Sequence, residues 1–366
     1  MSNWQPMNVN KNVKTKTVLL KDAEELRKEV YGMQEEGLCI VTSDKESTKT
    51  LTLTWVITRR ELTEDAIRNL ISKNVTPIKF KPIESKKKVI KNSVEKRFKT
   101  ESNVMAIVNI ADFHFNRMVV GADGFGMDYN IDIAEKVFRQ IILEAKQKMM
   151  RNSHNVERIV LNTAGDFLNS DTPLRTTTNG TPQVDSTSYR VALKRACDLL
   201  EWALIELAKV APVEYYYVAG NHDEQQGWAL TMCLEGRLRD NKNITVDTSS
   251  NTRATVVYGN NVIVMAHGDY EGKRAIDLPF NEPEARDVVS RATNMEVLTG
   301  HVHDVNVSKK NGVRWEVLST SCPVSCDWTY DKAYNSNPEA TILYYDNDYR
   351  VQQDTIYTRK FLKEVK

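Results

Sequence analysis

Five of the six histidines in this 366-residue chain lie in short motifs that also contain carboxylates, an asparagine or glycines. In chain order the motifs are Asp112-Phe113-His114, Gly165-Asp166, Gly220-Asn221-His222-Asp223, His267-Gly268-Asp269 and Gly300-His301-Val302-His303. Carboxylate, amide and imidazole groups without thiolates form a ligand set suited to Mn, Fe, Zn or a similar divalent cation. The motifs therefore predict a metal site with oxygen and nitrogen ligands rather than a structural zinc-thiolate site.

Each motif taken alone also has a simpler interpretation. An Asp-x-His pair occurs by chance, a Gly-Asp pair is typical of a turn, and a single histidine such as His267 is often a satisfied core residue. The ordered set is more specific, because only His154 falls outside it, in a segment expected to be a surface loop. We expect Asp112 and His114 to lie on one face of extended backbone, since side chains at i and i+2 align.

The motifs follow apolar runs that predict buried strands. These runs cover residues 104–110, 156–161, 213–218, 262–266 and 295–298. Amphipathic stretches at 131–151, 191–210 and 224–240 predict helices between the strands, and two hairpins are expected, at 305–319 and at 341–357. Because ligands bind at the carboxyl ends of strands in open α/β sheets, the alternation predicts a layered α/β body with the site at one sheet edge.

The sequence before residue 104 has a different pattern of polar and apolar residues. Residues 1–15 are polar and expected to be loose. The next stretch predicts a small α/β unit, with helices at 21–30 and 63–73 and strands at 38–42 and 50–58. The expected domains are therefore a small N-terminal α/β domain at 1–78, a basic linker or arm at 79–103 and the catalytic domain at 104–366.

Charge is distributed unevenly along the chain, although the net charge is only +1. Residues 1–104 carry 21 Lys and Arg against 14 Asp and Glu, a net +7, and the remainder carries 29 against 35, a net −6. Residues 79–99 alone hold nine Lys and Arg and two Glu. The basic head at 1–104 indicates either a polyanion contact or a solvated basic face. The stretch at 79–99 is either a nucleic-acid-binding arm or a solvated connector, and its scarcity of aromatic residues favours the connector.

The cysteine count and the lack of a membrane signal indicate a cytoplasmic protein. Five cysteines form an odd, sparse set, which predicts free thiols in a reducing compartment rather than a disulfide framework. We expect Cys322 and Cys326 to be ordinary thiols rather than zinc ligands. No apolar stretch approaches the roughly 18 residues of a membrane span, and the N-terminus has no signal-peptide core.

Residues 172–190 form an insert rich in Thr, Ser, Pro, Asn and Gly, without apolar periodicity. The insert follows the Asp166 motif and precedes a predicted helix, where a loop would overhang the site. It is either a polar surface loop or a substrate contact through Arg175, Tyr189 and Arg190.

The motifs together resemble the calcineurin-like metallophosphoesterase superfamily, whose pattern is D-x-H, G-D, G-N-H-[DE], H and G-H-x-H in that order. The resemblance covers about residues 104–304. It implies a four-layer fold, a β-sandwich flanked by helices, and divalent metal ions, most often Mn with Fe, Zn or Mg as alternatives. The segments 165–171, 176–182 and 211–223 further resemble phage-encoded members described as exonuclease-like or phosphodiesterase-like, which implies the host cytoplasm.

The resemblance also implies a role for each motif residue. Asp112, His114 and His303 would hold one metal, Asn221, His267 and His301 the other, Asp166 would bridge both, His222 would protonate the leaving oxygen, and Asp223 would orient His222 or line the site. One position departs from the phosphatase branches, which place an Asp three residues after the bridging Asp. This chain has Asn169 there, which favours the phosphodiesterase branches.

The expected function is a dinuclear-metal-dependent phosphodiesterase, a nuclease that hydrolyses DNA or RNA by attack of a metal-bound hydroxide, with His222 as general acid. One alternative is a phosphodiesterase for small or cyclic nucleotides, which a loop closing over a compact pocket would favour. Another is a binding or scaffold protein with a degenerate site, which the intact motif set opposes. The expected partners are nucleic acid or nucleotides and no membrane, with a homodimer as an option that relatives suggest.

Overall fold

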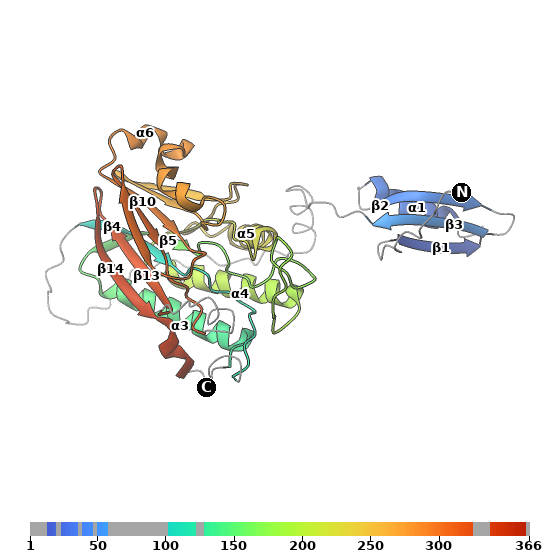
Figure 1. Cartoon of the computed structure of the whole chain (residues 1–366), viewed down its shortest axis with the longest axis horizontal. Coiled ribbons are helices and arrows are strands. Elements are labelled where there is room, and N and C mark those ends of the chain that lie inside the picture. Colours follow the sequence, from blue (N-terminus) through green and yellow to red (C-terminus); the bar gives the residue numbers. More distant parts are fainter. Residues whose placement is uncertain are drawn as a thin grey trace, which may run out of the picture. The chain divides into compact units, whose positions relative to one another are not determined.

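The computed structural model describes residues 13–19, 23–35, 39–46, 50–57, 102–121, 128–324 and 337–363. The chain divides into two compact units, residues 1–70 and 71–366, each of which is described by itself (Figure 1). The predicted helix at 63–73, the basic stretch at 79–99 and the boundary at residue 78 lie outside the described residues. The domain boundaries therefore stay predictions.

The described residues of the first unit form a three-stranded antiparallel sheet and a helix. These elements are β1 (Val13–Leu19), α1 (Ala23–Glu35), β2 (Cys39–Glu46) and β3 (Thr50–Ile57), with strand order β1-β3-β2. Helix α1 buries Leu26 and Val30, one turn apart on a single face, and β3 buries Leu53. The expectation of a loose segment at 1–15 is wrong for its last three residues. They begin β1, which is polar but pairs with β3 over its whole length.

The second unit contains two sheets. The first has six strands in the order β14-β13-β4-β5-β6-β7. Its members are β4 (Asn103–Asn109), β5 (Asn155–Asn162), β6 (Val213–Tyr215), β7 (Ile244–Val246), β13 (Glu339–Tyr345) and β14 (Arg350–Tyr357). Strands β4 to β7 run parallel, and the predicted C-terminal hairpin, β13 with β14, is added antiparallel to β4.

The second sheet has five strands in the order β11-β12-β10-β9-β8. Its members are β8 (Ala254–Tyr258), β9 (Asn261–Met265), β10 (Asn294–Thr299), β11 (Asn306–Lys310) and β12 (Val313–Val317). Strand β10 runs parallel to both of its neighbours, and the predicted hairpin around Asn311-Gly312 joins β11 to β12.

Helices cover the outer faces of the two sheets, as Figure 1 shows for the large unit. They are α3 (Ile131–Arg151), α4 (Tyr189–Leu207), α5 (Glu224–Leu238), η2 (Gly272–Phe280), η3 (Pro283–Ala285), α6 (Arg286–Val289) and η4 (Thr358–Lys363). Asn130 caps α3 by accepting hydrogen bonds from the backbone N–H groups of Asp132 and Ile133. None of the helices in the described ranges is both long and apolar enough to cross a bilayer.

The alternation of side chains along β4 explains the layering. Val104, Ala106 and Val108 are fully buried in a core shared with α3, α4 and α5. Met105 and Ile107 point to the opposite face and pack in a second core with residues of β9 and β10. A third apolar cluster joins the outer face of the five-stranded sheet to η2. The predicted fold class is confirmed as two sheets flanked by helices.

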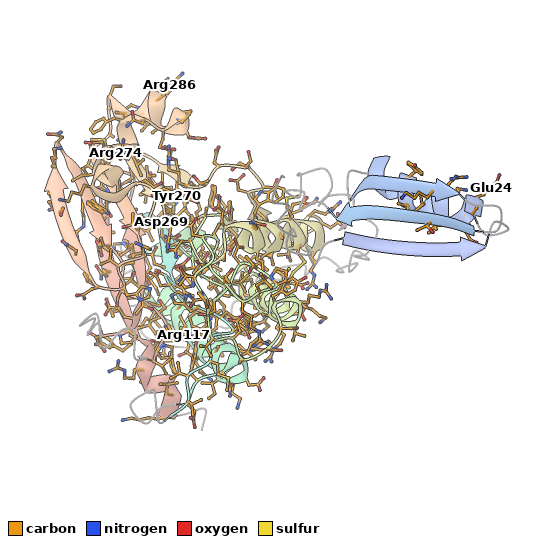
Figure 2. The ribbon with its side chains drawn as sticks, turned by 45° about the vertical axis from the view of Figure 1, so that its right-hand side comes forward. Glu24, Arg117, Asp269, Tyr270, Arg274 and Arg286 are labelled. Carbon is orange, nitrogen blue, oxygen red and sulfur yellow. A yellow bond between two sulfur atoms is a disulfide. The ribbon has the colours of Figure 1, made fainter. Side chains whose placement is uncertain are left out.

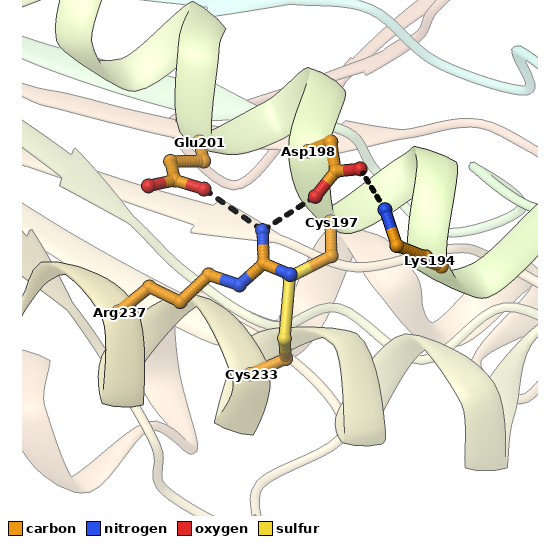
Figure 3. Close-up of a disulfide and its surroundings, with 6 residues drawn as sticks. All are labelled: Lys194, Cys197, Asp198, Glu201, Cys233 and Arg237. Atoms are coloured by element: carbon orange, nitrogen blue, oxygen red, sulfur yellow. Dashed lines mark hydrogen bonds and ion pairs between the residues drawn. A yellow bond between two sulfur atoms is a disulfide. The ribbon is translucent and has the colours of Figure 1, made fainter. Parts of the chain in front are cut away.

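The pairing of two cysteines corrects one expectation. Cys197 of α4 and Cys233 of α5 form a disulfide, although the sequence predicted free thiols (Figure 3). The two residues are 36 positions apart, and only the packing of α4 against α5 brings them together. On the same two helices, Arg237 donates to Asp198 at 2.7 Å and to Glu201 at 2.8 Å. Cys322 is a buried thiol, as predicted, and Cys326 lies outside the described residues.

Candidate metal centre

The five motifs follow strands of the two sheets. Asp112 follows β4, Asp166 follows β5, and Asn221 follows β6 after a short segment. From the second sheet, His267 follows β9 and His301 follows β10. Within each sheet these strands are parallel, so their carboxyl ends meet at one edge, where such folds bind ligands.

Phenylalanines next to the candidate ligands fix the first two motifs in the core. Phe113 and Phe115 flank His114, and both are fully buried. Their rings lie 5.9 and 5.8 Å from the ring of Phe167, which follows Asp166. Phe113 also contacts Phe138 of α3 edge-on, at 5.2 Å. The polar side chains are therefore held by apolar packing of their chain neighbours.

The backbone at the candidate ligands is not extended, which corrects the expectation drawn from the Asp-x-His spacing. Asp112 and His114 have φ of 47° and 49°, and Asp166 has φ of 52°. His301 and His303 have φ of 69° and 64°. Left-handed backbone costs non-glycine residues about 1–3 kcal/mol each and is typical of functional sites. The paired side chains thus reach the site through tight turns rather than along one face of a strand.

The first ligand set consists of Asp112, His114 and His303. His114 Nε2 lies 3.3 Å from His303 Nε2, which lies 3.5 Å from Asp112 Oδ1. Two atoms bound to one cation at about 2.0–2.2 Å are separated by roughly 3.0–3.5 Å. The three side chains therefore fit a single divalent cation, and all three are buried.

The second ligand set consists of Asn221, His267 and His301. Asn221 Oδ1 lies 3.1 Å from His267 Nε2 and 3.0 Å from His301 Nδ1. Asp166 Oδ2 lies 3.1 Å from His267 Nε2, and Asp166 also belongs to a cluster with His114 of the first set. The separations fit a second cation, and Asp166 stands between the two sets, where a bridging ligand would be needed.

Two glycines allow the motifs to approach one another. A Cβ on Gly300 would lie 2.5 Å from Asp112 Oδ2, and a Cβ on Gly220 would clash with the backbone and carboxylate of Asp166. Larger residues at either position would push the carboxylates out of the site. The glycines are thus needed for close approach.

Burial and mutual proximity shift the pKa values of these groups. Burial, with His222 and His303 nearby, lowers the pKa of His114 well below 6.5. Burial alone would also lower the pKa of His267, but the adjacent Asp166 carboxylate raises it to about 10. Burial would raise the pKa of Asp166, but the adjacent His267 lowers it below its usual value. In the metal-free protein, His267 therefore carries a proton that a cation would displace.

His222 lies beside the candidate ligands, and a hydrogen bond to the main chain orients its ring. Its Nδ1 donates to the backbone carbonyl of Asn169 at 2.9 Å, and its Nε2 lies 4.0 Å from Asp166 Oδ2. The backbone N–H of His222 donates to Asp166 Oδ1 at 2.7 Å. The acceptor at position 169 is thus the main-chain oxygen rather than the side chain.

Asp223 is placed behind the site. It is 2% exposed, and its two carboxylate oxygens accept the backbone N–H groups of Asp166 and Leu168, each at 3.0 Å. Burial, together with the nearby Asp166, raises the pKa of Asp223 to about 8. Asp223 supports the turn that carries Asp166 and is absent from the lining of the adjacent cavity.

A cavity of about 500 Å³ opens next to the candidate ligands. His222 and Asp166 line it on the metal side, together with His114, Asn221, His301 and His303. The cavity is also lined by Arg117, Met118, Asn169, Thr177, Thr181, Pro182, Gln183 and Val184. The lining can hold an anion next to the candidate ligands and an uncharged substituent against its apolar residues.

The insert at 172–190 overhangs the site, but through different residues from those expected. Thr177, Thr181 and Gln183 reach the cavity, whereas Arg175, Tyr189 and Arg190 are not among its lining residues. The basic residue that sequence reasoning missed is Arg117 (labelled in Figure 2). Its position three residues after His114 was the available signal.

Comparisons with known proteins agree with this geometry. The sequence profile described as calcineurin-like phosphoesterase matches residues 105–352. No curated protein sequence matches the chain.

Several solved structures are similar over most of their own length. A predicted phosphoesterase from Streptococcus pneumoniae is 12% identical, covers 70% of this chain and 90% of its own, and has a TM-score of 0.30. A novel archaeal phosphodiesterase is 14% identical, with coverage of 69% and 99% and a TM-score of 0.35. Vps29 from Chaetomium thermophilum is 9% identical, with coverage of 69% and 97% and a TM-score of 0.31.

The family match extends over more than half of the chain and includes every motif that supplies a candidate ligand. The family implies divalent metal ions, and the clustered carboxylates and imidazoles have the chemistry and spacing to hold them. The chain therefore belongs to the calcineurin-like phosphoesterase family and is a metal-dependent phosphoesterase.

Proposed function

We propose that this phosphoesterase is a phosphodiesterase that hydrolyses nucleic acid, with Mn²⁺ as its cation. The observation that carries the proposal is the composition of the cavity, whose wall combines the candidate ligands and His222 with Arg117 and with uncharged, partly apolar residues. A phosphodiester has a second ester substituent for such a wall to contact, and a phosphomonoester has none. Arg117 adds one cation to the wall, which suits the single charge of a diester.

The residues that would hold the cations are those of the two ligand sets. Asp112, His114 and His303 would bind one, and Asn221, His267 and His301 the other, with Asp166 shared between them. When bound, two divalent cations lower the pKa of a coordinated water and neutralise charge on the phosphoryl oxygens. The mixed oxygen and imidazole ligands, without thiolate, favour Mn²⁺ over a thiolate-bound zinc.

His222 is the residue placed to donate a proton to the leaving oxygen. With Nδ1–H bound to the carbonyl of Asn169, the remaining nitrogen, Nε2, is the one available to substrate on the cavity side. Protonation of a leaving alkoxide by a positioned acid contributes about 10²–10⁴ in rate. Arg117 would contact a non-bridging phosphate oxygen and hold the diester in place.

A polymeric substrate is supported by the rim of the cavity and by the charge of the chain. Met118 and Val184 line the cavity but are 41% and 68% exposed, so the rim is open to solvent. A strand that continues beyond the cleaved bond could pass over such a rim. The net +7 of residues 1–104 would add attraction to a polyanion.

A phosphodiesterase for small or cyclic nucleotides is the second candidate, and the fixed loop over the cavity favours it. Asp171 accepts the backbone N–H groups of Gln225 and Gln226, and Thr178 donates through its backbone N–H to the carbonyl of Asn221. The loop is thereby tied to the α5 end of the site. A volume of about 500 Å³ is also within the range of small-molecule sites.

The test is hydrolysis by the purified full-length chain with Mn²⁺, Mg²⁺ or EDTA. Substrates are bis-p-nitrophenyl phosphate, p-nitrophenyl phosphate, single- and double-stranded DNA, RNA and cyclic nucleotides. We expect Mn²⁺-dependent cleavage of the diester and of a nucleic acid, with nucleic-acid binding that weakens steeply with salt. Preference for the monoester would refute the proposal, and salt-insensitive cleavage of cyclic nucleotides alone would favour the second candidate.

A further inference from the structure

Asn169 connects the candidate general acid to the overhanging loop. Its backbone carbonyl accepts from His222 Nδ1 at 2.9 Å. Its side-chain amide donates in the other direction, to Asp185 Oδ1 at 2.8 Å and to the backbone carbonyl of Val184 at 3.2 Å. The residue whose carbonyl orients His222 is therefore held by the loop as well as by its own N–H, which donates to the carbonyl of Phe115 at 3.0 Å.

The Asp185 carboxylate accepts hydrogen bonds from two side chains of this segment. It is 4% exposed, and its second oxygen accepts from Ser170 Oγ at 2.5 Å. Both donors belong to consecutive residues, so one carboxylate holds the chain at 169 and 170. Hydrogen bonds to an ionised acceptor are roughly twice as strong as neutral ones, which makes this a firm anchor.

We propose that Asp185 is a positioning residue, which acts through Asn169 to hold the imidazole of His222 in its proton-donating orientation. The inference rests on the role proposed above for His222. A backbone carbonyl can orient a ring only if the backbone itself is fixed, and the Asp185 carboxylate adds two side-chain hydrogen bonds to the main-chain bond that Asn169 makes with Phe115. The loop therefore has a part in the chemistry as well as in forming the cavity wall.

The proposal differs from a purely structural role in a measurable way. Val184 lines the cavity next to Asp185, so a displaced wall would weaken binding of every substrate and raise KM. A misoriented His222 would instead lower kcat, and only where the leaving group must be protonated. A p-nitrophenolate leaves without a proton, whereas a nucleoside alkoxide requires one.

The experiment compares two diesters of thymidine 5′-phosphate, the p-nitrophenyl ester and the dinucleotide. For Asp185→Ala we expect kcat to fall about tenfold or more on the dinucleotide and less than about threefold on the p-nitrophenyl ester. Asp185→Asn keeps an acceptor for Asn169 and a partner for Ser170, so it should restore the dinucleotide rate to within about threefold of wild type. An equal loss on both esters, or a rise in KM alone, would overturn the proposal.

The matched control is Thr178→Val, in the same loop. Thr178 Oγ1 donates to Asp171 Oδ2 at 2.9 Å, so this variant loosens the loop but leaves the bonds of Asn169 and Asp185 intact. We expect the two esters to respond equally to it. If Asp185→Ala does not fold, Asn169→Ala carries the same test, since it removes the amide and keeps the carbonyl. Where both variants fold, their double mutant should be no worse than either single one.

His222→Ala separates failure of this inference from failure of the proposed function. If His222→Ala loses rate on the dinucleotide alone and Asp185→Ala does not, the general acid stands and the role of Asp185 is refuted. If His222→Ala affects both esters equally, the proposed role of His222 fails, and the inference fails with it.

Discussion

Metal binding should displace a proton from His267. Its pKa of about 10 means that it is almost fully protonated at pH 7, while His114, with a pKa well below 6.5, is neutral and ready to bind. A cation binds only the neutral imidazole, so it must displace the proton held by the Asp166 and His267 pair. Because the pKa of His267 is raised, the competition acts at every pH below about 10 and disappears above it. Each unit by which the pH falls in that range should weaken binding about tenfold, which is about 1.4 kcal/mol.

Isothermal titration of the metal-free protein with Mn²⁺ in buffers of different ionisation enthalpy measures this release directly. At pH 7 the slope of observed enthalpy against ionisation enthalpy should be larger by about one proton in the wild-type protein than in a variant that lacks the His267 ring. The control is His267→Gln, which removes the titrating ring and leaves Asp112, His114 and His303 to bind one cation. Binding without proton release in the wild-type protein, or the same release in the variant, would refute the reasoning.

Three substitutions test the ligand assignment. His222→Ala should retain both metals and lose about 10²–10⁴ in kcat, measured by metal analysis and turnover, and a metal-free variant would make His222 a ligand instead. Asp166→Asn should lose both metals or nearly all activity, and full activity would remove Asp166 as the shared ligand. Gly300→Ala should weaken metal binding at least about tenfold, because its Cβ would lie 2.5 Å from Asp112 Oδ2, and full metal occupancy would show that the carboxylate can move aside.

Much of the fold could be predicted from the sequence because its signals are local and regular. The amphipathic stretch at 131–151 coincides with α3, and the apolar runs at 104–110 and 156–161 correspond to β4 and β5. Strands of this kind are buried on both faces, so apolar content alone identifies them. Strand β1 was missed because its sequence is polar and its stability comes from pairing with β3.

The site was predictable in its residue types and order but not in its detailed geometry. The left-handed backbone at Asp112 and His114 carries no signal in an Asp-x-His pair, because neither residue is the glycine that marks such conformations. The pairing of Cys197 with Cys233 depends on how two helices pack, which spacing does not reveal. The hydrogen bond from His222 to Asn169 could not be predicted either, because its acceptor is a main-chain oxygen, which every residue type has.

The two ligand sets support each other through their backbones, which explains how a strained site can exist before any cation binds. Asp112, from the first set, accepts the N–H of His301 from the second at 3.0 and 3.1 Å. Asp166 likewise accepts the N–H of His222 at 2.7 Å. Hydrogen bonds to a charged acceptor contribute about 1.5–3 kcal/mol each, similar to the cost of about 1–3 kcal/mol for a left-handed residue. The carboxylates thus offset part of the strain of the turns that present them, in which five candidate ligands have left-handed backbone.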